Sequence, residues 1–297
     1  MYNTVVYVEL RPDDTILQNS QQYLDKVSRK KLDKGGLTYM VTVSDRTLSS
    51  EDNRSKFWSD GIGTEFVFSK LADQAKIHKM TPTTDGNAQY LKSSDCILSF
   101  AEIIRKLDKD SMLVLRGHGS PDRLGDFQAR AVARGLVKAG LSQNCFINLT
   151  GCKLGLSPQE RDRAQAPDVQ PGKATEVAEQ ISRGSWARVF AEELYASGRL
   201  RNRIHARLRN VSFVRYGSTD GFETREAADP VGPAVVIKRP VAIDKSDSGR
   251  KLTKAWEGVG TVGKLNHQAL SKIVINTEEN GNQQVSFYKY HANDFPD

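Results

Sequence analysis

The chain has little cysteine, and its cysteines lack the spacing of a structural site. The three are Cys96, Cys145 and Cys152, an odd number with no C-x-x-C pair among them. This excludes a disulfide framework and a zinc site of the usual spacing, and the five histidines show no metal-ligand pattern either. We therefore expect no metal, and a reducing compartment in which any reactive thiol would stay active.

Long hydrophobic runs are also lacking. No apolar stretch approaches the ~18 residues that a membrane-spanning helix needs. The first residues, MYNTVVYVELRPDD, lack the basic start and the apolar core of a secretory signal. We expect no membrane span and a cytoplasmic protein, or export by another route if the protein leaves its cell.

Charge, by contrast, is plentiful and unbalanced. Lys and Arg number 43 against 36 Asp and Glu, which gives a formal net charge of +7. Such a balance fits an anionic partner or simply a soluble basic surface. It does not choose between a nucleic acid, a membrane surface and a polyphosphate.

The strongest pattern lies in residues 111–154. The short apolar runs Met112–Leu115 and Cys145–Leu149 flank the helix-like segment Phe127–Ala139. Two short apolar runs separated by an amphipathic helix predict a β-α-β unit with parallel strands, and so an α/β fold. In such sheets, chemistry lies beyond the carboxyl ends of the strands.

Each of these predicted strands is followed by a residue that can do chemistry. His118 follows the first strand, and Cys152 follows the second. If the strands are neighbours, the imidazole can raise the thiolate fraction of the cysteine or protonate a leaving amine. The amides of Gly119 and Cys152 are then candidates for an oxyanion site. Taken singly, the cysteine is a small buried hydrophobe and the histidine a loop residue in the alternative interpretation.

A strand that ends in His-Gly, followed by one that ends in Gly-Cys, resembles the clan of cysteine peptidases that holds caspases, clostripain and legumain. The segments LVLRGHG and FINLTGCKL are most similar to the inositol-hexakisphosphate-activated cysteine protease domain of MARTX and large clostridial toxins. The resemblance covers about residues 66–290, with gaps, and includes SWARVFAEEL and VSFVRYG. It implies a caspase-like mixed, largely parallel sheet flanked by helices, with a C-terminal β-hairpin flap.

The resemblance also implies a function. The chain would be a cysteine endopeptidase of a bacterial toxin or effector, with a His118/Cys152 dyad, contributing to virulence. It would be secreted without a Sec signal, act in a host cytosol, and cleave after leucine in its own polypeptide (autoprocessing) or in a host protein. If Arg215 or Arg225 lined the pocket, as arginines do in caspases, aspartate would be preferred instead. The protease domain would comprise residues 61–297, with 1–60 as an N-terminal extension or appendage.

A second block of resemblance lies near the end of the chain. VAIDKSDSGRKLTKAW resembles the β-flap of the MARTX domains, and the flap would occupy about 234–290. Mapped onto this sequence, Arg250 and Lys251 would bind inositol hexakisphosphate as an allosteric activator, and Trp256 would couple the flap to the site. Clustered Arg and Lys suit a polyphosphate, because each phosphate needs several charged donors. A charged hairpin surface is the alternative.

Further lysines complete the activator hypothesis. The family has a lysine three residues after the flap tryptophan, where this chain has Val259, and Lys264 or Lys272 would substitute for it. Lys76 lies near the end of a predicted helix over 66–79, close to where the family has a Lys-His pair for phosphate contact. A solvated helix end is the alternative for this residue.

Two other function classes compete with the peptidase. The arginine-rich stretch 199–215 overlaps the run GRLRNRIHARLRN (residues 198–210), which invites a nucleic-acid interpretation. That run lacks aromatic residues for base stacking and no nucleic-acid motif occurs, so we do not expect a nucleic-acid partner. A non-catalytic module that presents a basic face to an anion or a protein partner is the other alternative.

The remaining elements are expected from apolar periodicity. A loop is expected over 217–232, directly after a strand at 211–216. Helices are expected at 97–107, 176–181 and 185–195, and strands at 5–10, 37–43, 211–216, 272–275 and 284–288, with 211–216 as the third strand of the sheet.

Overall fold

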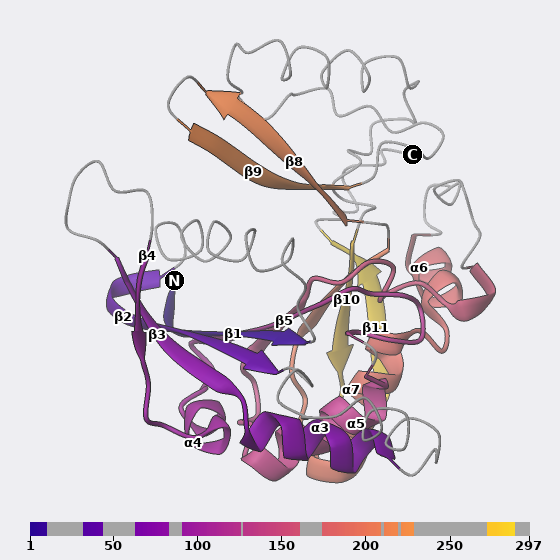
Figure 1. Cartoon of the computed structure of the whole chain (residues 1–297). Coiled ribbons are helices and arrows are strands. Elements are labelled where there is room, and N and C mark those ends of the chain that lie inside the picture. Colours follow the sequence, from indigo (N-terminus) through magenta and orange to yellow (C-terminus); the bar gives the residue numbers. More distant parts are fainter. Residues whose placement is uncertain are drawn as a thin grey trace.

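The computed structural model describes residues 1–10, 32–43, 63–82, 91–125, 127–160, 174–208, 211–218, 221–228 and 272–288. Within these ranges the chain forms a nine-stranded sheet and a separate two-stranded ribbon (Figure 1). The strands are β1 (Tyr2–Leu10), β2 (Leu32–Val43), β3 (Lys76–Pro82), β4 (Leu91–Asp95), β5 (Ser111–Arg116), β6 (Phe146–Leu149), β7 (Ile204–Arg207), β8 (Val211–Ser218), β9 (Gly221–Ala228), β10 (Lys272–Thr277) and β11 (Gln283–Phe287). The helices are α3 (Gly63–Asp73), α4 (Phe100–Arg105), α5 (Ala129–Ala139), α6 (Ala174–Ser182) and α7 (Trp186–Gly198).

The sheet is mixed and largely parallel, as the sequence predicts. Its strand order is β11-β10-β7-β6-β5-β1-β2-β3-β4. The strands from β7 through β6, β5 and β1 to β2 run parallel, while the flanking pairs at both ends are antiparallel. The carboxyl ends of the parallel strands therefore meet at one edge of the sheet.

The chain begins inside this sheet. β1 lies between β2 and β5, and its core residues Val5, Val6, Tyr7 and Val8 are fully buried. A continuous apolar run of this kind is typical of a central parallel strand, whose two faces are both covered. The described parts of residues 1–60, β1 and β2, therefore belong to the same sheet as β5.

The strand that follows β6 in the sheet is β7, which lies within the arginine-rich stretch. Ile204 and Ala206 are fully buried, while His205 and Arg207 alternate with them and are partly exposed. The alternation of buried and partly exposed residues extends over only four residues and is flanked by arginines. The sequence pattern therefore did not predict this strand. The strand expected at 211–216 is instead β8, which pairs with β9 in the separate ribbon. β9 also replaces the loop expected over 217–232.

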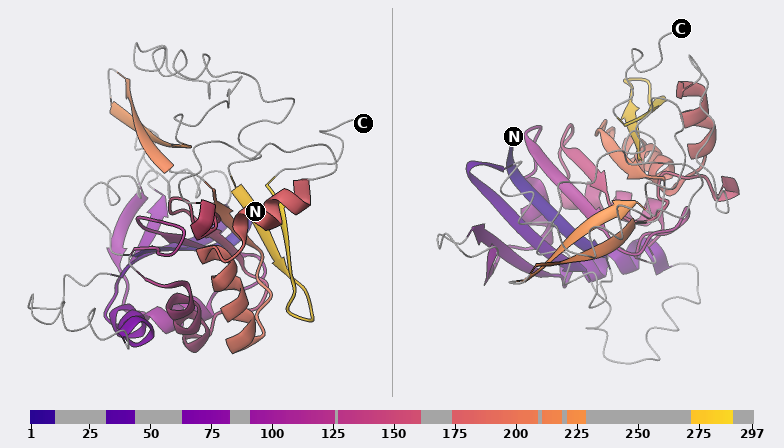
Figure 2. Two further views of the ribbon diagram at one scale, coloured as in Figure 1. Left: turned by 90° about the vertical axis from the view of Figure 1, so that its right-hand side faces the viewer. Right: turned by 90° about the horizontal axis from the view of Figure 1, so that it is seen from above.

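The helices pack on one face of the sheet. Successive strand residues point to opposite faces, so Val6, Val8 and Leu115 share one hydrophobic cluster with the buried residues of α3 to α7. On the other face, Tyr7 and Val114 belong to a second cluster of buried residues. Both Figure 1 and the left view of Figure 2 show the orange ribbon of β8 and β9 on the side of the sheet away from α5 and α7. In the described ranges, no helix is long and apolar enough to cross a membrane.

One predicted helix is shorter than expected. Helix α3 ends at Asp73, and the residues from Lys76 onward form β3 instead of a last helical turn. Ile77 and Met80 are buried in clusters on opposite faces of the sheet. Two apolar residues three positions apart lie on one face of a helix, or on opposite faces of a strand that is buried on both sides. The apolar pattern therefore did not distinguish a helix from a strand here.

A buried carboxylate joins two of the helices beneath the sheet. Glu193 of α7 is mostly buried and accepts a hydrogen bond from Arg134 Nε of α5 at 2.7 Å and one from Ser197 Oγ at 2.6 Å. Burial by itself raises the pKa of Glu193, but these hydrogen bonds and the charges of Arg134 and Arg130 outweigh it, and the pKa lies below its ordinary value of 4.5.

This carboxylate makes folding stability depend on pH. Because the folded pKa is lowered, the contribution of Glu193 is present above about pH 4.5 and is lost as the pH falls through the folded pKa. Arg134 is 44% exposed, so solvent screening should hold that contribution to about 1 kcal/mol. We expect Glu193→Gln to lose this amount at pH 7 and to show a flatter decline down to pH 3, measured by urea unfolding at a series of pH values.

The adjacent Glu192 is the matched control, because it is exposed on the same helix. Glu192→Gln should leave both the stability at pH 7 and its decline with acid close to those of the unchanged protein. Equal curves for the two variants would contradict the assignment to Glu193.

Candidate active site

The two predicted strands that precede His118 and Cys152 are neighbours in the sheet. β5 and β6 pair in parallel, with Met112 opposite Phe146 and Leu115 opposite Leu149. Just past the strand ends, the Thr150 amide donates to the Leu115 carbonyl at 2.9 Å. The loop that carries His118 and the loop that carries Cys152 therefore leave the same edge of the sheet side by side, as the sequence predicts.

The two loops touch where Gly119 meets Cys152. A Cβ atom placed on Gly119 would lie 2.5 Å from the Cys152 carbonyl oxygen and 2.7 Å from the Gly151 carbonyl carbon, and nearer still to the Cys152 amide nitrogen. All three are backbone atoms, which a side chain cannot displace cheaply. Glycine is thus the residue that lets the backbone next to His118 approach the backbone of Cys152.

A third strand end supports the same loop. The carbonyl oxygen of Leu10, at the end of β1, lies 2.7 Å from where a Cβ on Gly117 would stand, and it is also close to Gly125. Gly125 has a φ of +55°, and its amide donates to the His118 carbonyl at 2.7 Å. The backbone at His118 is therefore held both from the β1 side and from within its own loop.

The loop between β5 and α5 is internally braced, which makes it more than a flexible connection. Leu124 bridges Gly119 on one side and Phe127 on the other, and the Leu124 and Phe127 amides donate to each other's carbonyls at 3.1 and 3.0 Å. The Ser120 amide donates to the Arg123 carbonyl at 2.9 Å. These bonds fold the segment back on itself and keep His118 near the sheet edge.

Helix α7 fastens both loops at its first turn. The Trp186 amide donates to the Pro121 carbonyl of the histidine loop at 2.8 Å, and the Ala187 amide donates to the Leu154 carbonyl of the cysteine loop at 3.0 Å. Helix N-termini have amides without helical partners, and here the two loops supply the acceptors. Ser185 caps the same helix by accepting from the Arg188 amide.

The cysteines differ in their environment. Cys145 is fully buried, and burial raises the pKa of its thiol to about 12, although a hydrogen bond from Asn202 opposes this. A thiol of that kind stays protonated and inert at neutral pH. Cys152 is partly exposed and lies in the loop beside His118, which is itself exposed. Cys96 is also partly exposed and follows β4, an edge strand of the sheet.

Two buried charges, neither of which the sequence pattern singled out, lie just behind the candidate dyad. Glu9 of β1 and Arg116 of β5 stand opposite each other in register, and they are 0% and 2% exposed. Glu9 is the last but one residue of β1 and Arg116 is the last residue of β5, so opposite charges stand on neighbouring strands next to the loops. The single sequence signal for Glu9 was a charged residue near the end of an apolar run.

Most of the predicted activator residues lie outside the described ranges. Arg250, Lys251, Trp256 and Lys264 are in this group. Lys76 is exposed at the start of β3, opposite Thr42, at the same edge of the sheet as Arg116. Three strand spacings separate the backbone positions of Lys76 and Arg116, roughly 14 Å.

Other basic residues from the sequence interpretation occupy strands. Lys272 begins β10 opposite Arg207, at the site edge, with its Nζ 5.5 Å from the ring centre of Tyr288. Arg215 and Arg225 belong to the separate ribbon, where they pair with Thr224 and Val214.

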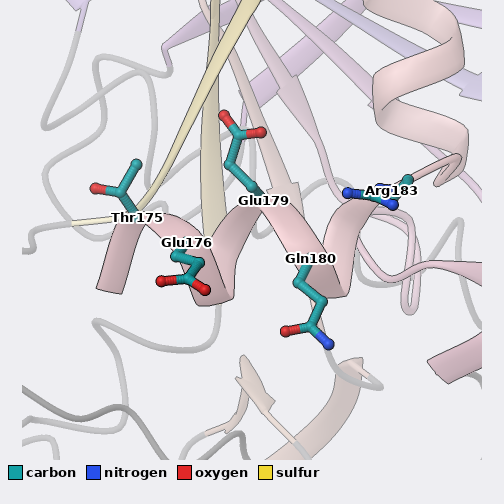
Figure 3. Close-up of a pocket in the computed structure, with 5 residues that line it drawn as sticks. All are labelled: Thr175, Glu176, Glu179, Gln180 and Arg183. Atoms are coloured by element: carbon teal, nitrogen blue, oxygen red, sulfur yellow. The ribbon is translucent and has the colours of Figure 1, made fainter. Parts of the chain in front are cut away.

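A surface pocket elsewhere does not contain the candidate dyad. Figure 3 shows it along α6, lined by Thr175, Glu176, Glu179, Gln180 and Arg183. Glu179 forms an ion pair with Arg188 at 3.6 Å. Because this pocket is built from one helix, lacks a nucleophile and lies apart from the strand ends, we assign it no chemistry. Among the described residues, no three His, Cys, Asp or Glu side chains gather as metal ligands.

Comparison with known proteins finds a likeness in structure but none in sequence. No protein-family model and no curated protein sequence matches this chain. Two solved structures of a secreted C11 cysteine protease from Bacteroides thetaiotaomicron, one in complex with an irreversible peptide inhibitor, are similar at 8% and 10% identity. Each comparison covers 94% of this chain and 67% of the other, with TM-scores of 0.35 and 0.37.

The contact between Gly119 and Cys152 leads to a direct test. Gly119→Ala should force the two loops apart, because the new Cβ would meet backbone on both sides. We expect a loss of about 1 to 3 kcal/mol in unfolding free energy, the usual cost of overpacking. We also expect slower alkylation of Cys152 by iodoacetamide at neutral pH, since the loop that carries His118 would move away from the loop that carries Cys152.

Gly35→Ala is the matched control. Gly35 has a φ of +86° and no atom within 4 Å of its would-be Cβ, so the change adds backbone strain without a clash. Its cost should be about 1 kcal/mol, with alkylation of Cys152 unchanged. An unaltered alkylation rate in Gly119→Ala would show that the loop contact does not control the thiol.

Proposed function

We propose that this chain is a cysteine endopeptidase that uses His118 and Cys152 as a dyad. The observation that carries the proposal is the contact between the Gly119 and Cys152 backbones, at the carboxyl ends of adjacent parallel strands. It brings a partly exposed cysteine next to the residue that follows an exposed histidine. Neither a buried structural cysteine nor an ordinary loop histidine requires that arrangement.

The chemistry would follow the pattern of thiol peptidases. The thiolate of Cys152 would attack the carbonyl carbon of the scissile peptide bond, and the electron pair of that carbonyl would move to its oxygen. His118 would deliver a proton to the leaving amine as the C–N bond breaks. Water would then attack the acyl-enzyme thioester, with His118 taking its proton, and would release the carboxylate product and the thiol.

The developing oxyanion needs donors. We assign this role to the amides of Gly119 and Cys152, which belong to the two touching loops. The loops are braced by hydrogen bonds to β5, β7 and α7, including the Gly155 amide on the Arg207 carbonyl at 2.7 Å. Donors held in this way need little rearrangement when charge develops, which is the basis of their effect on rate.

The substrate would be a protein. By its resemblance to the toxin domains, the chain would cut after leucine, either in its own polypeptide or in a host protein, as part of a bacterial toxin or effector acting in a host cytosol. The proposal that the chain belongs to a toxin or effector is supported by the resemblance of the segments LVLRGHG and FINLTGCKL and of the flap-like segment VAIDKSDSGRKLTKAW.

Inositol hexakisphosphate would be the activator. The basic pair Arg250 and Lys251, with Lys264 and Lys76, would bind its phosphates, and Trp256 would transmit the ordering of the flap to the dyad. The ligand can act in this way only by binding the ordered state better than the disordered one. A net charge of +7 favours such a polyanion at long range.

The peptidase proposal is tested by removing the nucleophile. Cys152→Ala should abolish cleavage of a fluorogenic peptide library and of the chain itself, while leaving the melting temperature within a few degrees, because alanine fills almost the same space. The assay should contain a reducing agent and be run with and without inositol hexakisphosphate, with intact mass recorded to locate any self-cleavage.

Cys96→Ala is the matched control, because Cys96 is also a partly exposed free thiol. It should retain full activity, and so should Cys145→Ala, whose thiol has a pKa raised to about 12. Cleavage by Cys152→Ala at the wild-type rate would remove the basis of the proposal.

Activator binding is tested separately. Inositol hexakisphosphate should raise both the melting temperature and the rate of peptide cleavage, and added salt should weaken both effects, since the contacts are ionic. Arg250→Ser/Lys251→Ser should lose most of the activation while Cys152 of the unactivated protein keeps its reactivity toward iodoacetamide.

The pair Arg105 and Lys106 supplies a control of equal charge, because both are exposed at the end of α4. Arg105→Ser/Lys106→Ser should respond to the activator as the unchanged protein does. Identical melting temperatures and rates from micromolar to millimolar ligand would refute activation and leave the peptidase proposal standing.

A further inference from the structure

We propose that Trp186 is a positioning residue that holds the loop of His118 against the loop of Cys152. Its side chain and backbone bind the histidine loop, and the next residue of the same helical turn binds the cysteine loop. The inference rests on the proposed function for its effect on catalysis. Its effect on the reactivity of the Cys152 thiol can be measured without any substrate.

Trp186 makes two separate hydrogen bonds to the histidine loop. Its indole Nε1 donates to the carbonyl of Phe127 at 3.0 Å, and its amide donates to the carbonyl of Pro121 at 2.8 Å. These acceptors lie on both sides of the turn that contains Leu124. The loop is therefore clamped at two points onto one residue.

The clamp reaches His118 through the loop's own hydrogen bonds. Phe127 exchanges hydrogen bonds with Leu124, and Leu124 bridges Gly119, the residue after the histidine. The Gly125 amide, next to Leu124, donates to the His118 carbonyl. A shift of Phe127 would thus be passed to both the carbonyl of His118 and the backbone of its neighbour.

The other half of the contact is made by Ala187. Its amide donates to the Leu154 carbonyl at 3.0 Å, two residues after Cys152. Leu154 also lies against Gly151, so the position of this carbonyl and that of the cysteine backbone are linked. One helical turn therefore sets the distance between the two loops.

The base of this clamp is rigid. Trp186 is 1% exposed and stacks on Phe190, with ring centres 5.0 Å apart and planes at 16°. Arg188 Nε donates to the Gln283 side chain at 2.8 Å, and Gln283 Nε2 donates back to the Arg188 carbonyl at 2.9 Å, which anchors α7 to β11. Because Trp186 and α7 are fixed in this way, the hydrogen bonds of Trp186 can fix the position of the histidine loop.

Trp186→Phe separates positioning from folding. Phenylalanine keeps an aromatic ring in the buried site and keeps the backbone bond to Pro121, but it removes the Nε1 donor. The Phe127 carbonyl still accepts from the Leu124 amide, so no buried acceptor is left without a bond. The variant should therefore fold, with the histidine loop more loosely held.

The test is the pH dependence of Cys152 alkylation by iodoacetamide, followed by intact mass in a Cys96→Ala background. A histidine near the thiol raises the thiolate fraction at neutral pH, whereas above the ordinary thiol pKa of about 8.5 the thiol ionises without help. Trp186→Phe should slow alkylation about fivefold at pH 7, the population change expected from one ordinary hydrogen bond. At pH 9.5 its rate should equal that of the parent.

Two comparisons make the result decisive. In a His118→Ala background, Trp186→Phe should cause no further slowing, because the tryptophan acts through the histidine. The matched control is Asn202→Ala, which removes buried side-chain donors to the Ser142 and Cys145 carbonyls at the opposite end of β6. It should lower stability without the pH-selective loss. Equal slowing in the presence and absence of His118, or the same pH profile in Asn202→Ala, would overturn the inference.

Peptide cleavage distinguishes this inference from the proposed function. If Trp186→Phe shows the pH-selective loss but the unchanged protein cleaves no peptide, the peptidase proposal fails and the positioning role stands. If the unchanged protein cleaves and Trp186→Phe has the same kcat, KM and pH profile, the positioning role fails and the peptidase proposal stands. A lowered kcat at nearly constant KM supports both.

Discussion

The close approach of Gly119 to the backbone of Cys152 is the constraint on which the candidate site depends. The loops that follow β5 and β6 meet there, and the end of β1 supports the first of them, because the Leu10 carbonyl lies against Gly117 and Gly125. Backbone atoms make the contact, so there is no space for a side chain at position 119, and the two loops can move little relative to each other. A dyad built from two short loops works only if those loops stay in contact, and glycine is what permits the contact.

The remainder of the fold holds these loops in place. A largely parallel sheet places the carboxyl ends of its strands at a common edge, where backbone groups no longer pair with neighbouring strands. Hydrogen bonds within the histidine loop, and from Trp186 and Ala187, use those groups. Below the sheet, Glu193 ties α7 to α5, so the helix that clamps the loops is itself fixed. Stability and positioning thus depend on the same helix.

Charge has two uses in this molecule. Among the residues that the structure describes, the buried charged groups are Glu9, Arg116 and Glu193, and each lies where elements meet. Exposed cations are numerous and give the chain its excess of +7, which suits an anionic activator without specifying one. The proposed activator would bind at basic residues of which Lys76 and Lys272 stand at the same sheet edge as the candidate dyad.

By itself, the sequence determined the β-α-β unit, the parallel pairing of β5 with β6, and the approximate places of α5, α6 and α7. Strong local periodicity marks these elements, and His118 and Cys152 follow their strands directly. The tertiary structure alone decided that β1 lies inside the sheet, that Ile204–Arg207 is its strand after β6, and that Lys76 begins a strand. It alone also revealed that Trp186 binds the histidine loop while Ala187, the next residue of α7, binds the cysteine loop. The physical reason is the distance along the chain over which each feature is determined. Periodicity in a short segment indicates which face of a helix or strand is buried, whereas strand order and loop contacts depend on residues far away in the sequence.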